Sequence, residues 1–173
     1  MTPNVKALLA CIVFALAGVV SALFFAPLSS LTVPHIIFYA VLTLNSYFSV
    51  RLFAAIQPQD TWQFIADAIL VAVYLALALS IGNAAWFAFF ALSVFIAASP
   101  KYALMLGKIP YTRLLKKKIR IDLMGTAFCA LILGATILGY QFQSAWALAL
   151  IFLVANMYLL MIKPMYRLGE RDS

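Results

Sequence analysis

Charge is scarce in this chain. Only 10% of its 173 residues are Asp, Glu, Lys or Arg, whereas 66% are hydrophobic. A soluble domain is about 25% charged and 45–50% apolar, and one of this size has too little interior to bury the excess. The composition therefore excludes an ordinary soluble domain and predicts that much of the protein surface faces lipid.

Residue types that bind metals or perform catalysis are almost absent. The chain has one histidine, His35, and two cysteines, Cys11 and Cys129, which are far apart and show no zinc-binding spacing. No GxSxG or HExxH motif occurs. The one enzymatic alternative is a dyad of Asp67 and Asp122, which is disfavoured because each has a nearer basic neighbour. We therefore expect no metal, no cofactor and no enzymatic activity.

Long hydrophobic runs are what the chain has instead. Six runs of about 20 residues can each cross a bilayer as a helix. They cover residues 5–25, 36–56, 62–81, 84–106, 121–140 and 144–162. The first run is longer than the core of a signal peptide, so we expect it to stay in the membrane. The predicted fold is all-α: a polytopic transmembrane helical bundle that forms a single integral membrane domain over residues 1–173.

The positive charges indicate how this bundle lies in the membrane. All twelve Lys and Arg residues fall on one side, in or beside the N-terminus, the turn after the second span, the loop after the fourth and the tail. Short cytoplasmic loops are enriched in Lys and Arg. We therefore expect both termini to be cytoplasmic, and the protein to reside in a bacterial inner (plasma) membrane.

The densest charge lies between the fourth and fifth spans, in RLLKKKIRID. We predict a basic cytoplasmic loop over residues 107–120, in which a helix starts after Pro110 and turns an apolar face toward the membrane. The residues expected to contact anionic lipid headgroups are Arg113, Lys116, Lys117, Lys118 and Arg120. A docking site for a partner protein is the alternative. Nucleic acid is not expected, because no base-reading or backbone-reading pattern is present.

Charged residues inside spans are rare and usually functional. Counted from the turn near Gln59, Arg51 and Asp67 lie at equal depth, which predicts an ion pair between the second and third spans. Lys101 and Asp122 are placed similarly about the basic loop, with Asp122 expected at the membrane surface. Such pairs can serve only to neutralise charge. Alternatively, Asp67 is the carboxylate of an ion or solute path, with Arg51 as its partner and Lys101 nearby.

Polar and small residues inside the spans add two further predictions. Asn45 and Asn156 lie near mid-span, where an amide needs a partner on a neighbouring helix, or lines a polar path. Thr126, Ala130 and Gly134 form a small-xxx-small stripe. That stripe predicts close helix packing inside the bundle, with a dimer face as the alternative.

Two functions fit these features. The first is a small transporter or channel for an ion or small solute, expected to be oligomeric, whose path uses Asp67, Arg51, Asn45, Asn156 and Lys101. The second is a non-catalytic membrane subunit that scaffolds or regulates a partner protein. A homo-oligomer and a complex with another membrane protein both stay open.

Overall fold

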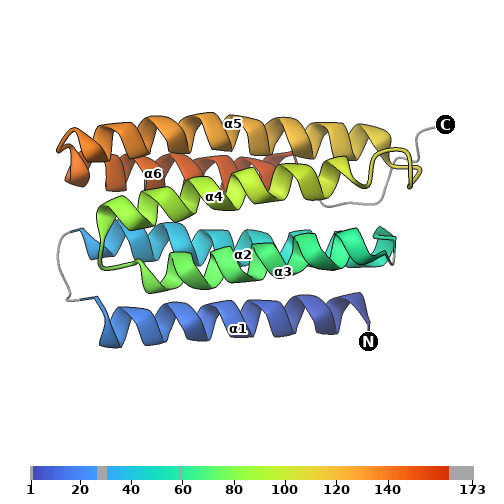
Figure 1. Ribbon diagram of the computed structural model, residues 1–173, viewed down its shortest axis with the longest axis horizontal. Helices are drawn as coiled ribbons and strands as arrows, with labels where there is room; N and C mark the ends of the chain where they lie inside the picture. Colours follow the sequence, from blue (N-terminus) through green and yellow to red (C-terminus); the bar gives the residue numbers. More distant parts are fainter. Residues whose placement is uncertain (1, 27–30, 59, 164–173) are drawn as a thin grey trace.

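The computed structural model describes residues 2–26, 31–58 and 60–163, and all regular structure in these residues is helical (Figure 1). The helices are α1 (Pro3–Phe24), α2 (Thr32–Ile56), α3 (Thr61–Leu79), α4 (Ala84–Ala103), α5 (Thr112–Ile137) and α6 (Gln141–Met157), which continues as a short π-helical turn, η1 (Tyr158–Ile162). Six helices, with η1 counted as part of the last, are long and apolar enough to cross a membrane. The predicted all-α bundle of six spans is confirmed.

Local side-chain chemistry determines where several helices begin and end. The Asp60 carboxylate accepts a hydrogen bond from the backbone N–H of Gln63 (2.8 Å) and so caps α3. Asn83 caps α4 in the same way, accepting from the N–H of Trp86 (3.1 Å). After α5 the chain turns at Gly139, whose φ of +97° is a conformation that side chains disfavour. These short turns keep consecutive helices antiparallel.

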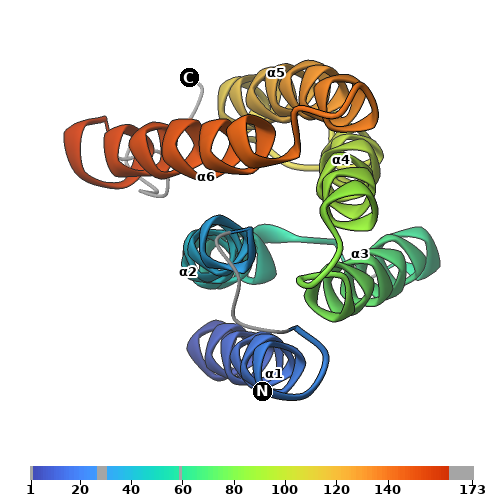
Figure 2. The same ribbon diagram turned by 90° about the vertical axis from the view of Figure 1, so that its left-hand side faces the viewer.

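The six helices form a closed ring. Around it the order is α1, α2, α6, α5, α4 and α3, with α3 packed back against α1 (Figure 2). Consecutive helices are therefore not always neighbours. In particular, α2 and α3 do not pack along their lengths, although only a short turn joins them.

One end of the ring carries the positive charge. We call it the basic end: α1, α3 and α5 begin there, and α2 and α4 end there. The described Lys and Arg residues all lie in this half of the bundle, namely Lys6, Arg51, Lys101, Lys108, Arg113, Lys116, Lys117, Lys118, Arg120 and Lys163.

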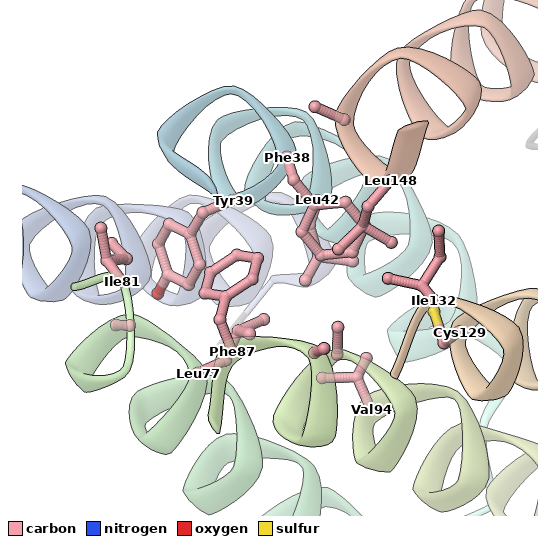
Figure 3. Packing of buried hydrophobic residues seen from close by; sticks show 14 of the residues in the cluster. Phe38, Tyr39, Leu42, Leu77, Ile81, Phe87, Val94, Cys129, Ile132 and Leu148 are labelled. Atoms are coloured by element: carbon pink, nitrogen blue, oxygen red, sulfur yellow. The ribbon is translucent and has the colours of Figure 1, made fainter. Parts of the chain in front are cut away.

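The opposite half of the ring is filled by apolar side chains (Figure 3). Phe38 and Phe87 are fully buried and meet edge to face, with ring centroids 5.7 Å apart. The His35 ring stacks on Phe87 at 4.1 Å, and a 2.9 Å hydrogen bond joins its Nδ1 to the carbonyl of Ile81. Aromatic and aliphatic packing of this kind fills much of the opposite half of the ring.

The basic loop is shorter than predicted. Helix α5 already begins at Thr112, so residues 112–120 form its first turns, and the connection from α4 shrinks to residues 104–111. The helix predicted to start after Pro110 is therefore present, and it continues into the fifth span without a break because lysines end a hydrophobic run without ending a helix. The apolar face of these turns is buried: Leu115 is fully covered and packs in a cluster with Phe53, Tyr102 and Met105.

The small-residue stripe does not provide the internal packing expected of it. Ala130 and Gly134 are exposed, and a Cβ added at Gly134 would meet no atom within 4 Å. The close contact between α4 and α5 is instead made at Gly125, where an added Cβ would lie 2.6 Å from the Phe95 ring. The prediction of internal packing through Ala130 and Gly134 was therefore wrong.

Candidate functional site: a charged cavity at the basic end

A cavity of about 330 Å³ occupies the basic half of the ring. It extends from Phe14 and Leu42 in the interior to Pro58 and Asp60 in the turn between α2 and α3. Helices α1 to α5 all contribute to its walls. The cavity exists because α2 and α3 do not pack together, and it opens toward the basic end.

Asp67 and Lys101 form the first charged pair of the cavity. Lys101 Nζ lies 2.5 Å from Asp67 Oδ1, and Gln57 Nε2 donates a hydrogen bond to Asp67 Oδ2 at 3.0 Å. Lys101 is buried, whereas the Asp67 side chain is 41% exposed. Gln63, also buried, donates to the backbone carbonyl of Lys101 (3.3 Å), which ties α3 to the last turn of α4. The acid is thus held between two neighbouring helices and faces the cavity.

Arg51 does not pair with Asp67, contrary to the prediction. Its exposed side chain lies in a shallow groove on the outside of α1 and α2, with Asn4, Leu8 and Tyr47. Equal depth was the wrong criterion, because α3 packs against α4 and α1 and not against α2. The predicted Lys101–Asp122 pair fails for the same reason: Lys101 is turned toward α3.

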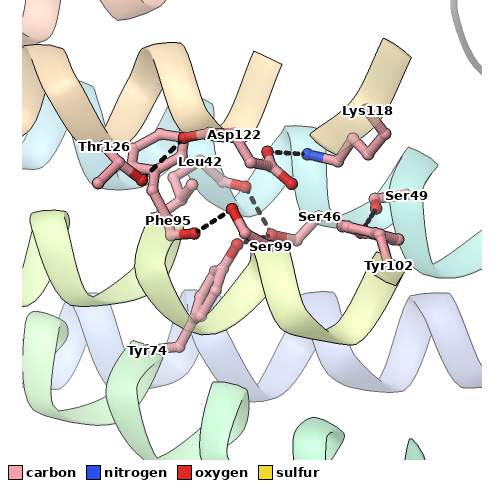
Figure 4. A network of polar contacts seen from close by, with 10 residues as sticks. All are labelled: Leu42, Ser46, Ser49, Tyr74, Phe95, Ser99, Tyr102, Lys118, Asp122 and Thr126. Atoms are coloured by element: carbon pink, nitrogen blue, oxygen red, sulfur yellow. Dashed lines mark hydrogen bonds and ion pairs between the residues drawn. The ribbon is translucent and has the colours of Figure 1, made fainter. Parts of the chain in front are cut away.

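Lys118 and Asp122 form the second pair, one turn apart on α5. Lys118 Nζ lies 2.5 Å from Asp122 Oδ1, and both residues are buried (Figure 4). Asp122 is only 1% exposed and so lies inside the bundle, and the predicted lipid contact of Lys118 was wrong because this side chain is buried too. Among the described residues, Asp122 Oδ2 has no hydrogen-bond partner. A buried carboxylate with an unused oxygen is costly in a low-dielectric interior.

The two pairs converge on Tyr102. The ammonium groups of Lys101 and Lys118 lie 5.9 Å and 5.2 Å from the centroid of its ring, within the range of a cation–π interaction. The Tyr102 hydroxyl shares a 2.9 Å hydrogen bond with Ser49 of α2. Two cations, each paired with an aspartate, therefore lie within cation–π range of one aromatic ring.

A second hydroxyl contact crosses the cavity (Figure 4). Ser46 donates to the carbonyl of Leu42 (2.8 Å) and shares a 2.6 Å hydrogen bond with the hydroxyl of Tyr74 on α3. Ser46, Ser49 and Tyr74 all line the cavity. The Ser46–Tyr74 contact therefore links α2 to α3, and the Ser49–Tyr102 contact links α2 to α4. Both links are made by side chains across the cavity.

The mouth of the cavity carries a further pair, Asp60 with Lys108. Lys108 Nζ lies 2.6 Å from Asp60 Oδ2, and the other carboxylate oxygen caps α3. The hydrogen bond from Lys108, followed by the one from the backbone N–H of Gln63, holds the pKa of the Asp60 carboxyl below its usual value. Asp60 therefore stays ionised at neutral pH.

The two asparagines lie in different places. Asn45 is half-buried and lines the cavity. Asn156 is buried on α6 away from the cavity lining, and its amide donates to the carbonyl of Phe152 in its own helix (2.9 Å). Of the five predicted path residues, the structure thus brings together Asp67, Lys101 and Asn45.

Several cavity residues were missed by the sequence analysis. Lys118 and Asp122 stand four residues apart, a spacing at which helical side chains meet, and this signal was present in the sequence. Ser46, Ser49, Tyr74 and Tyr102 gave no such signal, because they are common in membrane helices. The described residues contain no group of three His, Cys, Asp or Glu side chains that could hold a metal ion.

The four other basic residues of the predicted lipid-contacting set are exposed at the basic end: Arg113, Lys116, Lys117 and Arg120.

Comparison of the chain with protein-family models, with curated proteins and with solved structures gives no match. The case for a function therefore rests on the cavity and its charges.

Proposed function

We propose that this protein is a small integral membrane transporter, and that the charged cavity holds an ion or small solute on its way across the bilayer. The observation that carries the proposal is two Lys–Asp pairs beside Tyr102, one of them fully buried, inside helices that are long enough to span a membrane. Charged groups in the membrane interior are expensive and typically mark substrate or ion pathways.

A purely structural role explains these charges less well. Replacing a buried ion pair by apolar side chains is often neutral or stabilising, so stability alone gives no reason to keep Lys118 and Asp122 in the interior. The Asp67–Lys101 pair joins two different helices, and the half-exposed carboxylate is accessible from the cavity. A pair of this kind can open when a charged solute competes for either partner.

The apolar half of the ring favours a transporter over an open channel. Phe38, Phe87 and their neighbours fill the ring beyond the cavity. Release at the opposite end of a solute that enters from the basic end therefore requires a conformational change in which the helices move. We propose that the basic end faces the cytoplasm, since Lys and Arg concentrate on that side of bacterial membrane proteins.

We further propose that the exposed residues at the start of α5 contact anionic lipid. Arg113, Lys116, Lys117 and Arg120 lie at the level where headgroups are expected, and each contributes about 1 kcal/mol of attraction near an anionic surface. In this arrangement the lipid contact anchors α5, and the protein has no catalytic activity of its own.

An unbiased uptake experiment tests the transport proposal. Purified full-length protein is reconstituted into vesicles, which are incubated with a ¹³C-labelled extract of small molecules and salts and then analysed by mass spectrometry. We expect at least one solute or ion to accumulate with the wild type, and its uptake to fall roughly tenfold in Asp67→Asn, which removes the charge that holds Lys101.

The matched control is Arg51→Gln, because Arg51 is a charged residue of the neighbouring helix α2 that does not line the cavity. This variant should transport like the wild type. If nothing accumulates in wild-type vesicles, and a second protein stays bound through purification from native membrane, the protein is instead a subunit of a complex.

A further inference from the structure

The charges that line the cavity are balanced. Among the residues that the structure describes, the lining contains three lysines and three aspartates: Lys6, Asp60, Asp67, Lys101, Lys118 and Asp122. Lys6 and Asp60 lie near the mouth, and the other four form two ion pairs whose lysines lie near Tyr102. The formal charge of these six side chains sums to zero.

A balanced cavity discriminates between classes of solute. A solute with only a negative charge could bind a lysine only by leaving an aspartate unpaired in a low-dielectric interior. A solute with only a positive charge could bind an aspartate only by leaving a lysine unpaired there. A neutral solute would leave the ion pairs closed and would gain no charged contact from them. Only a solute that carries both signs can replace each broken contact with a new one.

The geometry provides a place for each end of such a solute. Asp122 is buried with one oxygen unpartnered among the described residues, and Asp67 is accessible, so an ammonium group can find a carboxylate at either position. The ammonium groups of Lys101 and Lys118 both lie within cation–π range of the Tyr102 ring, so a carboxylate beside this ring can reach either of them. The hydroxyls of Ser49 and Tyr102 are hydrogen-bonded to each other at the same place.

We propose that the cavity binds a small zwitterionic solute of the amino-acid class, with its carboxylate toward Lys101 and Lys118 and its ammonium group toward Asp67 or Asp122. This inference rests on the proposed function and specifies its substrate. The cavity volume of about 330 Å³ is at the lower end of the range for small-molecule sites, which run from about 300 to 1,000 Å³. A solute the size of a single amino acid matches this volume better than a larger dipolar molecule.

Binding is tested separately from transport, by thermal unfolding of the full-length protein in mild detergent. The probes are the common α-amino acids at millimolar concentration. We expect at least one to raise the Tm by roughly 5 °C. For that amino acid, two derivatives are then compared: the amide, which keeps only the positive charge, and the N-acetyl form, which keeps only the negative charge. Both should bind at least about tenfold more weakly, because each leaves buried charges unpaired.

Two variants locate the binding site. Lys101→Gln should abolish the Tm shift, and Arg51→Gln should retain it. If Lys101→Gln does not fold, Asp67→Asn replaces it, since the Asp67 side chain is 41% exposed and tolerates the change better. The comparison of the three probes on the wild-type protein depends on neither variant.

The outcomes separate this inference from the transport proposal. If no amino acid raises the Tm, or if either derivative binds as tightly as its parent, the zwitterion inference is wrong, even where the vesicles take up some other solute. If an amino acid binds in the predicted manner and no solute enters the vesicles, the binding inference holds and the transport proposal fails.

Discussion

At the scale of single residues, Lys118 and Asp122 are the most sensitive pair in the molecule. Both are buried, and their charged groups lie 2.5 Å apart. Lys118→Met leaves the Asp122 carboxylate without its partner, so we expect the free energy of unfolding to fall by about 3–5 kcal/mol. The double variant Lys118→Met, Asp122→Leu removes both charges and should recover most of this loss. Denaturant titration in mild detergent measures both effects.

The neighbouring Lys117 provides the control. It is exposed on the same turn of α5, and Lys117→Met should change the free energy of unfolding by no more than about 0.5 kcal/mol. Equal losses in Lys117→Met and Lys118→Met would contradict the buried pair, as would a double variant less stable than Lys118→Met alone.

Residue types were predicted better than residue partners. Charge inside a predicted span singled out Asp67 and Lys101, which the structure pairs at the cavity, since few other positions in so apolar a chain carry charge. Their partners depended on which helices are neighbours. Counting residues from a turn gives the position of a side chain along its helix. Which helix that side chain faces depends on the order of the helices around the ring, and the sequence of one span does not reveal this order.

At the scale of helices, the contact between α4 and α5 depends on Gly125. An alanine there would place its Cβ 2.6 Å from two carbons of the Phe95 ring, so the ring or the helix has to move. We expect Gly125→Ala to lower the free energy of unfolding by about 1–3 kcal/mol. Gly134→Ala lies on the same helix with open space around it, and should raise stability by up to about 1 kcal/mol through helix propensity. Thermal unfolding in detergent distinguishes the two, and a stabilised Gly125→Ala would contradict this packing.

Helix existence was predictable and helix boundaries less so. The six hydrophobic runs each correspond to one helix, because a run of about 20 apolar residues has few alternatives in a bilayer. The start of α5 lay nine residues earlier than the predicted span, since the amphipathic turns from Thr112 to Arg120 bury Leu115 against α2 and α4. Hydropathy identifies the part of a helix that is apolar enough to face lipid. It does not identify polar turns of the same helix that pack against other helices.

At the scale of the whole molecule, the ring combines two halves with different properties. The half at the basic end is hollow and charged, and the opposite half is packed with aromatic and aliphatic side chains. Trp62 at the basic end, and Trp86 and Tyr140 at the opposite end, are exposed near the ends of the helices, a distribution typical of the aromatic belts of membrane proteins. The 20-residue α4 is about 30 Å long, which matches the hydrocarbon thickness between those belts.

The distribution of charge between the two ends predicts the orientation of the whole bundle. Gln143 is exposed at the opposite end, and Lys117 is exposed at the basic end. In a background with Cys11→Ser and Cys129→Ala, we expect Gln143→Cys to react with a membrane-impermeant maleimide added to intact bacterial cells. Lys117→Cys should react only after the membrane is permeabilised, because positively charged segments remain in the cytoplasm. If Lys117→Cys reacts in intact cells and Gln143→Cys does not, the cavity faces the outside of the cell. Labelling of both positions in intact cells would contradict a single orientation.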